Sequence, residues 1–353
     1  MKKSYKRRNF IKNAGIAGIG FAITSNIRGI SLNREKRISK GGRSDSYRIG
    51  IIGLDTSHSV AFTKIFNDPA AADDLGGFRV VAAYPKGSND IEASVRRIAG
   101  FTKEIEALGV HIVSSIEELI NKVDVVLLET NDGRLHLEQA LPVLKAGKRL
   151  FIDKPLSASL AGVLSIFEAA KKYESPVFSS SSLRYFENVR DIEMGKIGRV
   201  TGADTFSPAT LEKTHSDLFW YGIHGVEMLF TVLGTGCKTV SRVFTDGTEI
   251  VVGLWDENRI GTFRGLRSGK MDYGGIVFGD KDILTINPGK DYGYRSLLVK
   301  IVEFFQTGKP PVNPEETIEI YAFMAAAEES TRNKGITVSL ESTLKKARQI
   351  LND

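Results

Sequence analysis

Apolar residues fall into short continuous runs between residues 47 and 182, and several runs are followed by segments with helical spacing. Uninterrupted apolar runs of strand length are typical of parallel strands buried on both faces. The runs predict strands over residues 47–53, 78–83, 110–114, 124–128, 149–152 and 176–182, and the periodic segments predict helices over 60–67, 116–121, 135–145 and 158–173. This alternation predicts an α/β domain with a doubly wound parallel sheet over residues 46–183.

The pattern changes beyond residue 184, where the expected strands are spaced as in hairpins. Asp246-Gly247 and Gly279-Asp280 separate successive apolar segments, and such pairs suit tight hairpin turns. The expected strands cover residues 199–206, 238–244, 249–255, 259–264, 273–278 and 281–286, and the expected helices cover 222–233, 294–306 and 315–332. Residues 184–353 are therefore predicted to form an α+β domain on a largely antiparallel open sheet.

The first 45 residues differ from the rest in charge. They contain twelve Lys and Arg residues against Glu35 and Asp45. Within them, Arg7-Arg8-Asn9-Phe10-Ile11-Lys12 precedes an apolar stretch, an order that resembles a twin-arginine export signal. We expect these residues to be a signal and linker read by the twin-arginine machinery, and the protein to be periplasmic. Tethering by an uncleaved signal is the alternative, although the apolar stretch is short for a membrane-spanning helix.

These first 45 residues, the leader, account for the net positive charge of the whole chain. The formal net charge is +6, yet the residues after the leader include 36 basic and 40 acidic side chains. A mildly acidic body gives little electrostatic support for nucleic-acid binding, so nucleic acids are not expected partners. The single cysteine, Cys237, excludes an internal disulfide and is expected to be a small buried residue.

The segment from Asp124 to Leu156 delivers polar side chains to one edge of the predicted sheet. Ligands of open α/β sheets bind outside the carboxyl ends of the strands. One expected strand ends before Thr130, Asn131 and His136, and the next ends on Asp153 and Lys154. These two groups mark the edge at which chemistry is expected.

Three motifs of this segment resemble the glucose–fructose oxidoreductase / inositol dehydrogenase family, called Gfo/Idh/MocA. They are Thr130-Asn131 with His136, the turn Ala146-Gly147-Lys148, and the strand end Asp153-Lys154-Pro155. The likeness runs from about Tyr47 to the C-terminus. It implies a Rossmann domain that binds NAD or NADP, followed by a domain that binds a sugar or cyclitol and forms homo-oligomers.

The resemblance assigns catalytic roles to Lys154 and His224. Lys154 matches the family's catalytic lysine, and a residue before proline is held extended, which directs its ammonium group into the cleft. His224 matches a histidine at a helix start that acts as general base on the substrate hydroxyl. A surface lysine and a core histidine are the alternatives. The family's usual Asp is Trp220 here, and Asp217 or His215 is a possible replacement.

The expected nucleotide loop departs from the family pattern. The fingerprint G-x-G-x-x-G lets backbone amides approach the pyrophosphate, and this chain retains only Gly53 of its glycines. Asp55 brings a negative charge to the phosphates, which Thr56, Ser57 and His58 would offset. Other expected cofactor contacts are Thr130, Asn131, His136 and Asp153.

The turn after the second strand bears on the choice of cofactor. It lacks the acidic residue expected for a ribose diol, and Lys86 and Ser88 suit a 2′-phosphate instead. NADP is therefore slightly favoured over NAD. Free NAD(P) is scarce outside the cytoplasm, so an exported redox enzyme is expected to retain its cofactor tightly.

These observations favour an exported NAD(P)-dependent oxidoreductase acting on a sugar, polyol or derivative. The alternatives are a non-redox relative (a lyase, hydrolase or isomerase with a degenerate nucleotide loop) and a carbohydrate-binding protein. Six residues have side chains of types that can bind a metal ion: Asp55, His58, His215, Asp217, His224 and Glu227. They show no compact metal-binding spacing, so no metal is predicted.

Overall fold

The computed structural model describes residues 47–71, 73–288 and 293–352. The expected twin-arginine signal and linker over residues 1–45 lie outside the described residues. In the described part of the chain, no helix is both long and apolar enough to cross a membrane.

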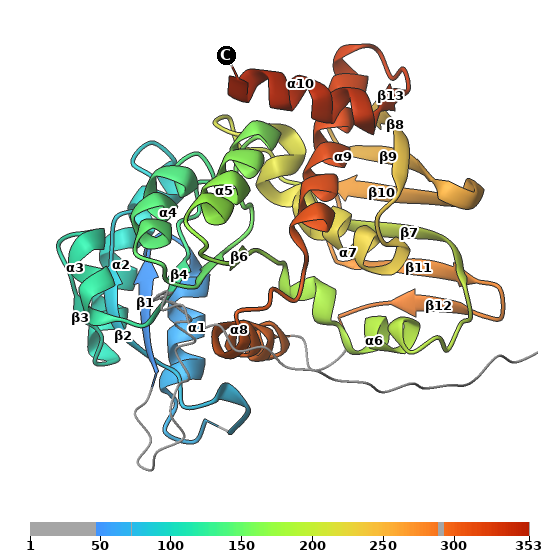
Figure 1. Ribbon diagram of the computed structural model, residues 1–353. Coiled ribbons are helices and arrows are strands. Elements are labelled where there is room, and N and C mark those ends of the chain that lie inside the picture. The colour runs from blue at the N-terminus through green and yellow to red at the C-terminus, as the bar shows by residue number, and fades with distance from the viewer. Residues whose placement is uncertain (1–46, 72, 289–292, 353) are drawn as a thin grey trace, which may run out of the picture. The chain divides into compact units, whose positions relative to one another are not determined.

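A six-stranded parallel sheet forms the first half of the fold (Figure 1). Its strand order is β3-β2-β1-β4-β5-β6, and each neighbouring pair is parallel. The strands are β1 (Arg48–Ile52), β2 (Arg79–Tyr84), β3 (His111–Ile112), β4 (Val125–Leu128), β5 (Leu150–Ile152) and β6 (Val177–Phe178). The predicted doubly wound sheet is confirmed, because its strands are the apolar runs of the sequence.

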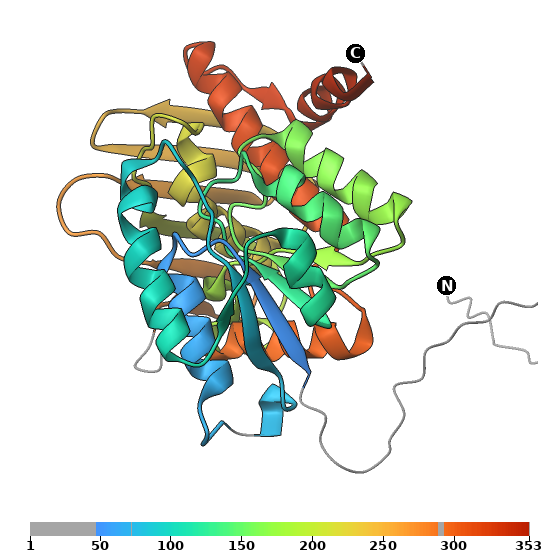
Figure 2. The same ribbon diagram turned by 90° about the vertical axis from the view of Figure 1, so that its left-hand side faces the viewer.

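Helices cover both faces of this sheet, as Figure 2 shows for its two sides. They are α1 (Ser57–Asn67), α2 (Glu92–Ala107), α3 (Ile116–Lys122), α4 (His136–Lys145) and α5 (Leu160–Lys172). Thr56 caps α1, so that helix begins three residues before the predicted start. Helix α2 was not predicted; only Ser94 and Ile105 in it are buried, and charged residues separate its apolar positions.

The two faces of the sheet belong to different apolar cores. Ile49 and Ile51 of β1 pack in one core with α1 and α8 (Arg295–Thr307), and Ile52 packs in the other with α3, α4 and α5. Alternation of side chains along a strand produces this division. Helix α8 lies beyond residue 184 in the sequence yet packs on the first sheet, so the predicted boundary at residues 183–184 does not separate the cores.

The second half of the fold is a seven-stranded sheet of order β12-β11-β7-β10-β9-β8-β13 (Figure 1). Its strands are β7 (Val200–Pro208), β8 (Cys237–Phe244), β9 (Thr248–Trp255), β10 (Ile260–Leu266), β11 (Gly274–Gly279), β12 (Ile283–Ile286) and β13 (Val338–Ser339). The pair of β7 and β10 is parallel and the other pairs are antiparallel. The predicted α+β architecture with a largely antiparallel sheet is confirmed.

One face of the second sheet packs against α7 (Ile223–Leu233) and α9 (Pro314–Arg332). Three further elements were not predicted from the sequence: α6 (Glu187–Glu193), the two-residue β13 and the C-terminal α10 (Leu340–Asn352). Cys237 is buried as expected. Helix α7 matters most for function, because it carries His224 at its second residue.

Candidate active site

The turn between β1 and α1 begins the site at the carboxyl edge of the parallel sheet. Gly53 adopts φ +89°, and a Cβ at this position would collide with Thr130. The sequence needs glycine here for both reasons. Thr130 is fully buried and its hydroxyl has no hydrogen-bond partner among the described residues. Thr56 is nearly buried, whereas the side chain of Ser57 is exposed.

Asp55, the third residue of this turn, is fully buried. Its carboxylate accepts the backbone N–H groups of Ser88 and Asn131, each at 3.0 Å. Burial raises the pKa of Asp55, and the two backbone hydrogen bonds oppose that shift. A Cβ at Gly87 would collide with the same carboxylate. Asp55 therefore ties the loops that follow β2 and β4 to the β1–α1 turn.

These two loops are also joined directly. The Ser88 hydroxyl donates to Asp132 at 2.8 Å, and Arg134 pairs with Asp132 at 2.6 Å and with Asp90 at 2.5 Å. Hydrogen bonds to Arg134 lower the pKa of Asp90, and they outweigh burial in lowering that of Asp132. Ser88 is thus engaged within the protein, whereas Lys86 is exposed.

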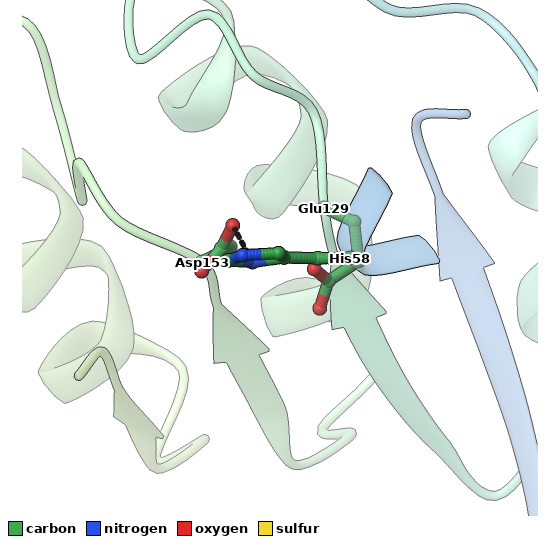
Figure 3. Close-up of side chains that lie close together, drawn as sticks. All are labelled: His58, Glu129 and Asp153. Atoms are coloured by element: carbon green, nitrogen blue, oxygen red, sulfur yellow. Dashed lines mark hydrogen bonds and ion pairs between the residues drawn. The ribbon is translucent and has the colours of Figure 1, made fainter. Parts of the chain in front are cut away.

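His58, Glu129 and Asp153 lie together above the ends of β4 and β5 (Figure 3). His58 Nδ1 is 2.7 Å from Asp153 Oδ2. Glu129 is fully buried, and both of its carboxylate oxygens lack a partner in the described structure, as does Asp153 Oδ1. Burial and the charge of Asp153 raise the pKa of Glu129 well above its usual range. Burial opposes ionisation of Asp153, but His58 and Lys154 overcome it and lower the pKa of Asp153.

The two predicted catalytic side chains meet at Tyr221. Lys154 Nζ is 6.0 Å from the centroid of the Tyr221 ring, and the ring of His224 is 5.0 Å from it, centroid to centroid. Lys154 and His224 are each 7% exposed. The Lys154 ammonium also lies 4.0 Å from Asp153 Oδ2, and its peptide bond to Pro155 is cis. Residues from both halves of the fold therefore lie close together around Tyr221.

His224 is held by polar groups behind it. Its Nδ1 is 2.7 Å from the hydroxyl of Ser181, and Ser181 N donates to Glu227 at 2.9 Å. Arg184 pairs with Glu227 at 3.0 Å and with Glu316 at 2.7 Å. Burial lowers the pKa of His224 well below its usual range, and the positive charge of Lys154 adds to this shift. This shift favours the neutral form of the imidazole.

The π-helical turn Leu218–Gly222 leads into α7 and carries Trp220 in place of the family's acid. Trp220 packs against His215, with ring centroids 4.9 Å apart. Asp217, one possible replacement for the acid, pairs with Arg242 at 3.1 Å. His215, the other, lies 3.5 Å from Asp132. Both are thus engaged with groups other than His224.

Two residues that were predicted to contact the cofactor, His136 and Asn131, use their side chains in hydrogen bonds within the protein. His136 is fully buried between the carbonyl oxygens of Thr130 at 2.7 Å and Leu156 at 3.1 Å, so it joins the ends of β4 and β5. Asn131 donates its side-chain amide to Ser94 at 3.3 Å. Sequence reasoning also missed Glu129. The signal was available, because a carboxylate ending an apolar strand lies at the ligand-binding edge.

Comparison with known proteins agrees with this geometry. Residues 47–180 match the model of the Gfo/Idh/MocA family, described as an oxidoreductase family with an NAD-binding Rossmann fold. The match lies within the first domain and agrees with the resemblance seen in the three sequence motifs.

Two curated relatives are inositol dehydrogenases. The chain is 24% identical to inositol 2-dehydrogenase of Salmonella typhimurium over 219 residues, which are 59% of this chain and 61% of the relative. It is 31% identical to myo-inositol 2-dehydrogenase of Thermotoga maritima over 141 residues, 36% of this chain and 41% of the relative. The match thus spans about three-fifths of the first relative's length.

The likeness of the fold extends over both domains. A structure of scyllo-inositol dehydrogenase from Lactobacillus casei with bound NAD(H) and scyllo-inositol has a TM-score of 0.65 and 14% sequence identity. The match covers 84% of this chain and 99% of that one. At this level of identity the comparison establishes the architecture alone.

The nucleotide loop fits a dinucleotide only in part. The Gly53 turn and the start of α1 match the place where backbone N–H groups receive a pyrophosphate. The Asp55 carboxylate does not fit, because it already accepts the Ser88 and Asn131 amides and would repel phosphates. A nucleotide that approaches this turn meets the negative charge of Asp55.

We expect Asp55→Asn to bind reduced NAD or NADP about tenfold more tightly than the natural protein, because it removes this repulsion. Fluorescence titration with NADH and NADPH measures the affinity. Asp124→Asn, which removes an exposed carboxylate beside Arg48, is the matched control and should leave affinity unchanged. Equal affinities of Asp55→Asn and the natural protein would show that Asp55 does not oppose binding.

Proposed function

We propose that this protein is an NAD(P)-dependent oxidoreductase that acts on a polyol, a sugar or one of their derivatives. The convergence of Lys154 and His224 on Tyr221, at the carboxyl edge of the sheet, is the observation that carries the proposal. The family description of residues 47–180 and the inositol dehydrogenases among the relatives support it.

In this proposal His224 takes the proton from the substrate hydroxyl. The neutral imidazole suits this role, and its contact with Ser181 fixes the ring. Lys154 places a positive charge where the hydroxyl oxygen becomes an alkoxide, and so stabilises it. The nicotinamide of NAD(P), when bound, supplies the hydride acceptor. Gly53, Thr56 and Ser57 would hold its phosphates.

The choice between the two cofactors rests on Lys86. It is exposed after β2, where a lysine suits the 2′-phosphate of NADP. Ser88 offers less support than its sequence position suggested, because its hydroxyl is engaged with Asp90 and Asp132. NADP thus stays the slightly favoured cofactor within the proposal, on the strength of Lys86 alone.

A non-redox relative is the second candidate, and Asp55 favours it. A lyase, hydrolase or isomerase needs acid and base groups but no reversible nicotinamide step. Lys154, His224 and the buried carboxyls at the strand ends would serve such chemistry without a nucleotide. The identity of any retained nucleotide separates the two candidates.

We expect the natively purified full chain to release stoichiometric NAD(H) or NADP(H) on denaturation, detected by mass spectrometry, because an exported enzyme has no free pool to draw on. Absence of both nucleotides, together with no binding on titration, would contradict the redox proposal. Detection of turnover in that nucleotide-free protein would support the second candidate.

We expect Lys154→Met and His224→Gln each to lower kcat for polyol oxidation by about 10²–10⁴-fold, since each removes charge stabilisation or proton transfer. Steady-state kinetics with a panel of cyclitols and sugars measures the change. Lys145→Met and His111→Gln, both at exposed positions, are the matched controls. Unchanged kcat in either active-site variant would remove the role given to that residue.

Export by the twin-arginine route is also proposed, on the basis of Arg7-Arg8 and the basic leader. We expect replacement of both arginines by lysine to retain the full-length protein in the cytoplasm of a host with this pathway. Cell fractionation and immunoblotting measure the distribution, and replacement of Lys2 and Lys3 by arginine is the control. Equal periplasmic amounts for both double variants would contradict the proposal.

A homo-oligomer is proposed through the open face of the second sheet. Val252, Leu254 and Ile260 are 37%, 41% and 53% exposed, and Leu254 pairs with Ile260 across β9 and β10. An apolar sheet face of this kind suits contact with a second copy. We expect Leu254→Lys to reduce the molar mass by light scattering, whereas Val95→Lys on α2 leaves it unchanged. A monomeric natural protein would contradict this.

A further inference from the structure

The buried cluster of His58, Glu129 and Asp153 has more acceptor atoms than the surrounding protein satisfies. Both oxygens of Glu129 and Oδ1 of Asp153 have no hydrogen-bond partner among the described residues. Glu129 is fully buried and Asp153 is 2% exposed. Buried carboxylates are costly unless they are paired or coordinate a metal. We propose that His58, Glu129 and Asp153 bind a divalent first-row metal ion of the Zn²⁺ or Mn²⁺ class, which is a site beyond the proposed redox function.

The three side chains point into a common space. Each offers one ligand atom, and these atoms all lie within 4.8 Å of one another. Figure 3 shows the carboxylates beside the imidazole, above the ends of β4 and β5. Ligand atoms at about 2.1 Å from a tetrahedral ion lie about 3.4 Å apart, so binding requires an inward movement of the side chains of about 1 Å.

The ligand types select the class of ion. An imidazole with two carboxylates is a mixed nitrogen and oxygen donor set, which suits zinc, manganese or iron better than calcium or a thiolate-bound metal. The 2.7 Å contact of His58 Nδ1 with Asp153 Oδ2 shows that two of the proposed ligands already face each other. Tyr294 and Phe62 pack against the same ring, with centroids 4.7 and 5.3 Å away.

A proton on Glu129 is the competing way to remove the charge. Burial and the charge of Asp153 raise the pKa of Glu129, which favours the protonated form when no ion is bound. A proton on Glu129 can satisfy one acceptor through its O–H, whereas a divalent ion accepts an oxygen from each of the two carboxylates and a nitrogen from His58 at once. With His58 neutral, as metal coordination requires, Lys154 at 4.0 Å from Asp153 contributes one positive charge against two carboxylates. The ion therefore completes the charge balance and the coordination together.

Rigid elements hold the ligands beside the proposed reaction centre. His58 lies in the first turn of α1, Glu129 follows β4, and Asp153 follows β5 directly before Lys154. Three protein ligands leave at least one open position for an oxygen of water or substrate. The assignment extends the predicted roles of His58 and Asp153 from nucleotide contact to metal binding, and it adds Glu129.

The test measures metal binding on the untagged full chain. We expect plasma mass spectrometry of protein purified without chelator to find about one zinc or manganese ion per chain. After removal of metal, calorimetric titration with Zn²⁺ and Mn²⁺ should restore binding. Glu129→Gln should weaken the affinity at least about tenfold, while Glu328→Gln, a mostly buried carboxyl of the second domain, should not.

Thermal unfolding gives a second, independent readout. Addition of the metal should raise the Tm of the stripped natural protein by mass action, and at the same metal concentration should raise the Tm of Glu129→Gln less. Absence of both heat and a Tm rise in the natural protein would overturn the proposal, as would unaltered binding by Glu129→Gln. These outcomes are independent of nucleotide content, so the metal site and the redox proposal fail separately.

Discussion

The site depends on the burial of charge at the carboxyl ends of β4 and β5. Parallel strands deliver Glu129, Asp153 and Lys154 to one edge, and helix α1 adds His58 from above. None of these groups is stable in isolation in a buried position, because each loses the solvation that water gives its charge. Their mutual contacts offset part of that cost. The pKa shifts of Glu129 and Asp153 in opposite directions follow from the same crowding.

The second domain completes this edge rather than forming a separate site. Tyr221 and His224 approach Lys154 from α7 and the π-helical turn before it. The contact with Ser181, which Glu227 and Arg184 back up, fixes the His224 ring in place, and burial lowers the pKa of that ring. In the proposed function, the second domain brings His224 as proton acceptor to Lys154, which the first domain positions. Neither half supplies both groups.

Much of this arrangement follows from sequence patterns, and the rest depends on contacts that patterns do not contain. The buried strands were predictable because continuous apolar runs have few alternatives at that length. Lys154 was predictable because it ends such a strand before Pro155. The expectation that Lys154 and His224 share one site came from the family resemblance, because spacing along the chain does not determine distances between domains. Helix α2 was missed because few of its residues are buried and charged residues separate its apolar positions. Asp55 was expected to disturb a phosphate site, but its hydrogen bonds to Ser88 and Asn131 became visible only in the structure.

The most direct test of the proposed chemistry follows the hydrogen that leaves the substrate carbon. The full-length protein is incubated with a cyclitol or sugar deuterated at its carbinol carbons, and the nicotinamide is then analysed by mass spectrometry. The account predicts deuterium in the nicotinamide for the natural protein and much slower incorporation for Lys154→Met. Conversion of the substrate with no deuterium in the nicotinamide would contradict it.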